Sequence, residues 1–140
     1  MTKTEYYFVI DADIIPIKPF SLFENNKPIL FAKPNARDES AFIRYISKAT
    51  GGDLAVWTDA EYATTSYISD LMVFKKSWIN EMIHKYFSSE DQFLLFSSLI
   101  TYWQKIPNIR KKSIFMSEYE LYGRYIAKYH TDEIAIKSIV

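Results

Sequence analysis

The sequence predicts one α/β domain, because strand-like segments dominate its first half and helical patterns its second, with mixing that argues against two segregated layers. The chain has 140 residues, 49% of them hydrophobic, which is ample for a single core. Residues 6–10, YYFVI, form an unbroken β-favouring run, typical of a strand covered on both faces in a parallel or mixed sheet. No repeat or long linker divides the sequence. We therefore expect residues 1–140 to form a single domain.

Three strands and one helix are expected in the first half of the chain. Pro16 and Pro19 break regular structure after the first strand. Asp38 can cap a helix, which Gly51 and Gly52 end. The expected strands cover residues 6–10, 27–33 (KPILFAK) and 66–76 (SYISDLMVFKK), and the expected helix covers residues 39–49.

Helices with capping signals dominate the second half. Ser77 can cap a helix in which apolar residues recur at helical spacing. Ser89 begins a capping-box pattern before the run FLLFSSLITYW, and Ser117 with Glu120 forms another. The alternation of residues 133–140, EIAIKSIV, predicts a closing strand.

Composition limits the classes of function. Lys and Arg number 17, as do Asp and Glu, so the net charge is zero and no long-range field favours nucleic acid or an anionic membrane. The absence of cysteine excludes disulfides, thiolate catalysis and cysteine-ligated zinc. We expect no signal peptide, because the apolar run near the N-terminus is short and interrupted by acids, and no span approaches the ~20 apolar residues that cross a bilayer. We expect a cytoplasmic protein with no transmembrane segment and no nucleic-acid partner.

Two aspartates follow the first strand. Asp11 and Asp13, separated by Ala12, emerge on the same side if the strand continues through them. Their mutual repulsion is relieved by a hard cation such as Mg²⁺ or Mn²⁺, which prefers oxygen ligands and commonly bridges carboxylates to phosphates. Open α/β sheets also bind ligands beyond the carboxyl ends of their strands. From spacing alone, a metal site and a strand end made of Asx turns are equally good interpretations.

A family resemblance favours the metal site. The segment YYFVIDADIIPIKPFSLFENNKPILF resembles the DxD block of GT-A glycosyltransferases. Followed by SDLMVFKKSWINEMI and then SEYELYGRYI, it looks like a bacterial group of poorly characterised GT-A enzymes. The resemblance extends from about Tyr6 to Tyr125, and SEYELYG is its more specific signal.

The resemblance implies a partial GT-A-like mixed sheet flanked by helices, and a metal-dependent glycosyltransferase. Such an enzyme transfers a sugar from a nucleotide-sugar donor to a hydroxyl acceptor, for example in surface polysaccharide synthesis. The residues that it assigns are Asp11, Ala12 and Asp13 to the nucleotide sugar, Asp11 and Asp13 to Mn²⁺ or Mg²⁺, Tyr119, Tyr122 and Asp70 to the acceptor, and Glu118 or Glu120 to catalysis.

Several of these residues also have structural interpretations. Glu120 belongs to a capping box, and Glu118 lies in a first turn, where the helix dipole favours any acid. Tyr122 falls on the apolar stripe of its helix. Asp70 occupies a place where relatives of this group often carry histidine, which leaves the third metal ligand open. His84 and His130 have no partner at ligand spacing and are interpreted as surface or dipole-favoured histidines.

The position of the DxD block is unusual for a GT-A fold. Only five residues precede Tyr6, so we expect the N-terminal nucleotide-binding half to be lacking and sugar-nucleotide binding by the chain alone to be weak. The exposed strand is also expected to favour a homo-oligomer or a partner that supplies the missing half, because an unpaired sheet edge recruits another strand.

Two other classes of function compete with a glycosyltransferase. Haloacid-dehalogenase-like phosphatases begin with an apolar strand ending in Asp-x-Asp, in which Asp11 would be the nucleophile and Asp13 the general acid, with Mg²⁺. This interpretation ranks second because the sequence lacks a convincing second acidic pair at a strand end. A non-catalytic interaction module ranks third.

Overall fold

The structure is a computed structural model that describes residues 4–12, 15–34, 50–54, 65–67, 69–87 and 117–138. Its elements are β1 (Tyr6–Ile10), β2 (Phe23–Glu24), β3 (Lys27–Pro34), β4 (Thr65–Ser66), β5 (Leu71–Lys75), α3 (Lys76–Tyr86), α5 (Glu118–Tyr129), the 3₁₀ helix η2 (Thr131–Glu133) and β6 (Ala135–Ser138). The predicted α/β class is confirmed. The helix expected over residues 39–49 and the run FLLFSSLITYW lie outside the described residues.

The described strands form two sheets. β1 pairs with β5 in antiparallel orientation, from Tyr6 opposite Lys75 to Ile10 opposite Leu71. β3 pairs with β6 in parallel and with β2 and β4 in antiparallel orientation. The strand predicted at residues 27–33 is therefore confirmed as β3. The strand predicted at residues 133–140 is confirmed over Ala135–Ser138 as β6, whereas Glu133 belongs to η2.

Two sequence-based expectations about strands are wrong. β1 is not covered on both faces, since Tyr7 is 39% exposed and Ile10 36% exposed. The strand predicted over residues 66–76 is two strands, β4 and β5. The extended path is interrupted between them, where Tyr67 N donates to a carboxylate of α5 and the Ser69 hydroxyl donates to Leu71 O.

A tight turn joins β2 to β3. Asn25 and Asn26 have φ values of +51° and +64°, the left-handed region that asparagine tolerates better than most residues. Two successive positive φ values are typical of a type I′ turn, whose twist matches that of a β-hairpin. The consecutive asparagines of ENNK therefore determine the register in which β2 meets β3.

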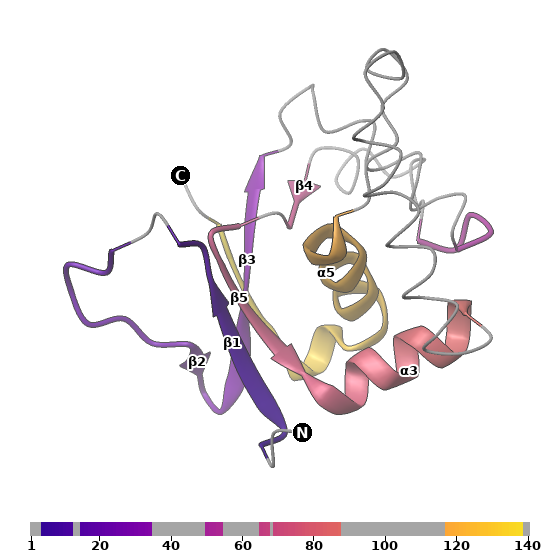
Figure 1. Cartoon of the computed structure of the whole chain (residues 1–140), viewed down its shortest axis with the longest axis horizontal. Helices are drawn as coiled ribbons and strands as arrows, with labels where there is room; N and C mark the ends of the chain where they lie inside the picture. The colour runs from indigo at the N-terminus through magenta and orange to yellow at the C-terminus, as the bar shows by residue number, and fades with distance from the viewer. Residues whose placement is uncertain are drawn as a thin grey trace.

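Both long helices lie on one side of the strands, as Figure 1 shows. Between them and the sheet is a core of buried side chains that includes Leu30, Met72, Phe74, Trp78, Leu121, Tyr122, Tyr125 and Ile126. Residues 15–22 loop outward on the side away from the helices (Figure 1). No helix within the described ranges has both the length and the apolarity that a bilayer span requires.

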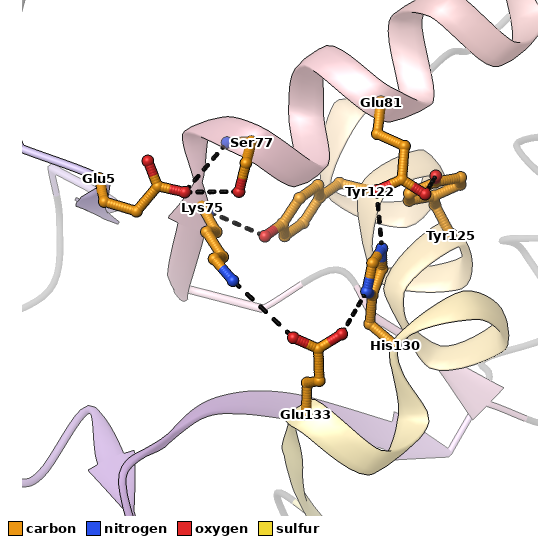
Figure 2. Close-up of polar contacts among 8 residues, drawn as sticks. All are labelled: Glu5, Lys75, Ser77, Glu81, Tyr122, Tyr125, His130 and Glu133. Carbon is orange, nitrogen blue, oxygen red and sulfur yellow. Dashed lines mark hydrogen bonds and ion pairs between the residues drawn. The ribbon is translucent and has the colours of Figure 1, made fainter.

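The start of α3 differs from the prediction. Ser77 is not the N-cap, because the helix begins at Lys76 and the capping position, Lys75, makes no side-chain cap bond. Instead, Glu5 meets the first free N–H groups of the helix: its carbonyl accepts from Lys76 N at 2.8 Å, and its carboxylate accepts from Ser77 N at 3.3 Å. Figure 2 shows this carboxylate reaching the first turn. A residue just before β1 thus supplies the cap that the local sequence lacks.

Candidate functional site

Asp11, the first residue of the predicted DxD pair, follows β1 and is exposed. Its N–H donates to Asp70 O at 3.0 Å, so the antiparallel ladder continues one step beyond the strand. Asp70 is exposed as well, and so is Ala12. Two acids that are distant in the sequence therefore sit next to each other at one sheet end. Asp13, the second residue of the pair, lies outside the described residues.

The N-terminus of α5 adds an acid and a phenol to this region. Ser117 caps the helix by accepting from Glu120 N at 3.2 Å, as predicted. Glu118 is exposed in the first turn, and the Tyr119 ring packs 5.7 Å from that of Phe74 on β5. Partial burial raises the pKa of the Tyr119 hydroxyl.

The negative charges of Asp11 and Glu118 raise the pKa of Tyr119 further. Both carboxylates are therefore close enough to act on the same phenol. We call the set Asp11, Asp70, Glu118 and Tyr119 the carboxylate rim. It combines carboxylate oxygens from the residue after β1, from the residue before β5 and from the first turn of α5, with an aromatic ring among them.

The carboxylate rim carries ligands suited to a hard cation. Asp11 and Asp70 supply carboxylate oxygens, which Mg²⁺ and Mn²⁺ prefer. Across the residues that the structure describes, no three acidic or histidine side chains converge as a metal-binding group. A complete ligand set would thus include Asp13, substrate oxygens or water, in keeping with the few protein ligands that Mg²⁺ commonly uses.

Glu120, the other predicted catalytic glutamate, is in a different environment. Its side chain is buried, and Oε1 accepts from Arg124 Nε at 2.5 Å. Oε2 accepts from Tyr67 N at 2.7 Å and from the Ser66 hydroxyl at 3.2 Å. The carboxylate therefore holds α5 against the chain that leaves β4, and it does not return to its own N-cap as a capping box requires. Of the two glutamates, Glu118 alone faces solvent.

The rest of the SEYELYG segment also contributes to helix docking. A Cβ atom on Gly123 would lie 2.3 Å from Tyr67 Cβ, so only glycine allows this approach. Arg124 Nη2 donates to Thr65 O at 3.0 Å. Tyr122, predicted to meet the acceptor, is 1% exposed, and its hydroxyl accepts from Lys75 N at 2.9 Å. Burial raises the pKa of Tyr122.

Sequence reasoning missed a second polar cluster, which Figure 2 shows around His130. His130 Nδ1 lies 2.8 Å from Glu133 Oε1, and Nε2 lies 3.3 Å from Glu81 Oε2, an ion-pair distance without hydrogen-bond geometry. The ring stacks on Trp78 at 4.6 Å, and only 11% of the side chain is exposed. His130 is thus not a surface histidine. In the sequence, Glu133 three residues after it could have indicated that the ring has an acidic partner.

The neighbours of His130 tie several elements together. Tyr125 OH donates to Glu81 Oε1 at 2.6 Å, which joins α5 to α3. Lys75 Nζ lies 3.8 Å from Glu133 Oε2 and 4.3 Å above the Trp78 ring, a cation–π contact. Each charge in this cluster has an opposite charge or a ring beside it, so the cluster is best explained as a structural tie. His84, by contrast, is exposed, as the sequence predicted.

Asp53 forms a third polar cluster near the C-terminal ends of both helices. Its carboxylate accepts from Tyr86 OH and Tyr129 OH at 2.6 Å each and from Lys128 Nζ at 2.7 Å. These bonds, the one from Lys128 first, lower the pKa of Asp53 far below its usual range. The loop of residues 50–54 is thereby held to α3 and α5.

Compared with protein-family models, curated proteins and solved structures, the chain matches none of them.

Proposed function

We propose that the carboxylate rim is the donor-binding edge of a metal-dependent glycosyltransferase, which transfers a sugar from a nucleotide sugar to a hydroxyl acceptor. The observation that carries the proposal is the convergence of Asp11, Asp70 and Tyr119, which lie on different segments of the chain. Each was a candidate for the donor or acceptor site. The Asp11–Asp70 backbone bond joins these two acids at one sheet end, and Asp11 lies near enough to Tyr119 for its charge to add to the effect of burial in raising the pKa of that phenol.

Asp11, together with Asp13, would hold the divalent cation. When bound, Mn²⁺ or Mg²⁺ stabilises the negative charge that develops on the leaving nucleoside diphosphate. The exposure of Asp11 supports this role, because a carboxylate already committed to buried donors would have no lone pairs left for an ion.

Glu118 is the residue that we assign to acceptor activation. It is exposed on the carboxylate rim, whereas Glu120 is buried and satisfied by Arg124. A solvent-facing carboxylate can accept the proton of an acceptor hydroxyl as the new glycosidic bond forms. Tyr119 beside it offers a partly exposed ring on which the apolar face of a sugar can pack.

Calorimetry with Mn²⁺ and UDP, GDP or CDP tests the proposal. We expect weak but metal-dependent nucleotide binding by the wild-type protein, which Asp11→Asn and Asp13→Asn should each abolish. Asp132→Asn is the matched control, since Asp132 is an exposed acid on η2, away from the carboxylate rim.

Two results would contradict the proposal. One is equal nucleotide binding by the wild type, Asp11→Asn and Asp132→Asn. The other is hydrolysis of a phosphomonoester with phosphate trapped on Asp11, which would select the phosphatase instead. An absence of any metal or nucleotide binding is the result expected of a non-catalytic interaction module, and equally of a chain that needs a partner to supply its nucleotide-binding half.

A further inference from the structure

The backbone of β1 has a hydrogen-bonding partner on one edge within the described part of the chain, and that partner is β5. At the two ends of this ladder, Glu5 O accepts from the residue after β5, and Asp11 N donates to the residue before it. Antiparallel strands exchange hydrogen bonds at every second residue, so the odd-numbered residues of β1 bond to β5. Tyr6, Phe8 and Ile10 therefore direct their N–H and C=O groups away from β5.

The outward-facing N–H of Lys75 on β5 has a hydrogen-bond acceptor, unlike the outward-facing N–H groups of β1. Lys75 lies opposite Tyr6, so the Lys75 N–H points out of the ladder, and it donates to Tyr122 OH at 2.9 Å. No described group bonds to the corresponding N–H groups of Tyr6, Phe8 and Ile10. Residues 6–10 contain no lysine or proline, and their ladder with β5 has no bulge, so β1 itself lacks these three features that protect edge strands.

The segment that follows β1 contacts its side chains but does not pair with its edge. Phe20 lies 6.1 Å from Phe8 between ring centroids, and Phe23 lies 5.2 Å from Tyr6. These ring contacts place residues 20–23 over one face of β1, and no described ladder joins them to it.

We propose that the open edge of β1 binds the same edge of a second copy of this chain, forming an antiparallel dimer with its two-fold axis at Phe8. The inference is independent of the proposed function. In this register Phe8 faces the partner's Phe8, and Tyr6 faces the partner's Ile10. The residues whose N–H and C=O groups face away from β5 therefore lie opposite one another along the whole strand and can exchange hydrogen bonds. The interface is isologous, as in most homodimers.

The side chains of β1 suit this self-pairing. Tyr6 faces the partner's Ile10 and Tyr7 faces the partner's Val9, which are aromatic–aliphatic cross-strand pairs of the favourable kind. Residues 6–10 carry no charge and the whole chain has a net charge of zero, so a second copy meets no general repulsion. Just beyond the strands, Asp11 faces the partner's Glu5, two like charges. Added salt should therefore strengthen the dimer, because it screens this pair.

Two substitutions of Phe8 separate the backbone contribution from the side-chain contribution. Phe8→Pro removes the outward N–H and breaks no bond to β5, a placement that edge strands tolerate. Phe8→Ala removes the same ring and keeps the N–H. We expect Phe8→Pro to weaken dimerisation about 30-fold relative to Phe8→Ala, since two hydrogen bonds of about 1 kcal/mol each are lost across the two-fold axis.

Sedimentation equilibrium over a range of protein concentrations measures these constants, and circular dichroism verifies that each variant is folded. A wild-type protein that stays monomeric throughout would overturn the proposal. Equal dimerisation constants for folded Phe8→Pro and folded Phe8→Ala would overturn it as well.

Cysteine cross-linking tests the register without proline. The chain has no cysteine, so a single introduced thiol can pair only with that of another copy. In Phe8→Cys the paired Cα atoms would be about 5.5 Å apart, within the range that a disulfide spans. In Ile10→Cys, on the same face, the two thiol-bearing residues would be about 13 Å apart along the joined strands. We expect a disulfide-linked dimer from Phe8→Cys and none from Ile10→Cys. Equal rates of cross-linking in the two variants would overturn the proposed register.

Discussion

Glu118 and Glu120 lie two residues apart in the first turn of α5, yet they occupy opposite environments. Glu118 is exposed on the carboxylate rim, whereas Glu120 is 1% exposed and bonded to Arg124 and Tyr67. The reason is helical geometry, since two residues along an α-helix differ by about 200° around its axis. Two glutamates in one short motif therefore have different roles, one available to a ligand and one committed to packing.

The same division applies to the tyrosines of the segment. Tyr119 remains partly exposed beside Glu118, while Tyr122 is buried and bonded to Lys75 N. The side of α5 that meets the sheet thus holds the residues that dock the helix. The first turn of the helix holds Glu118 and Tyr119, the residues that we assign to chemistry.

Substitution of the two glutamates should separate these roles most strongly. We expect Glu120→Ala to lower the free energy of unfolding by about 3 kcal/mol, because Arg124 would remain buried without this carboxylate. The matched variant Glu118→Ala should change it by no more than about 0.5 kcal/mol, as is usual at exposed sites. Urea unfolding measures both values. Similar losses of unfolding free energy in Glu118→Ala and Glu120→Ala would contradict the assignment of different roles to the two glutamates.

Gly123→Ala tests the close approach on the docking side of α5. Helix propensity alone predicts that alanine stabilises an internal helical position by about 1 kcal/mol. The new Cβ would lie 2.3 Å from Tyr67 Cβ, so we expect destabilisation of about 2 kcal/mol instead. Thermal and urea unfolding give the sign directly. A more stable variant would show that Tyr67 moves aside easily and that the contact does not position α5.

Asp53 is an intermediate case, a partly exposed carboxylate that is nonetheless held by three donors. Its pKa is lower in the folded chain than in the unfolded chain, so its contribution to stability is present above about pH 4 and is lost as the pH falls toward the folded pKa. We expect Asp53→Asn to cost about 1.5 kcal/mol at neutral pH, and the difference from wild type to shrink in acid.

Urea unfolding at neutral pH and at about pH 3 measures the change in that difference. Asp132→Asn, an exposed acid on η2, serves as the control and should show little effect at either pH. A loss in Asp53→Asn that stayed constant with pH would mean that the carboxylate charge is not what holds the loop.

Sequence patterns predicted the strands β1, β3 and β6 and the cap of α5 well, because each depends on neighbouring residues. They failed for α3, since Glu5 supplies its cap from more than 70 residues away in the sequence. They failed for His130, whose second acidic neighbour, Glu81, belongs to another helix. The split between β4 and β5 was missed for the same reason, since Tyr67 bonds to Glu120 on α5.

Local order along the chain was enough to indicate an α/β fold, an acid at the end of the first strand and a capped helix carrying SEYELYG. These features arise from side-chain periodicity and from bonds between residues a few positions apart. Which acids are exposed and which are buried depended on the packing of segments that are distant in sequence. The environment of a carboxylate is set by the donors that packing brings to it, and those donors here come from other strands and helices.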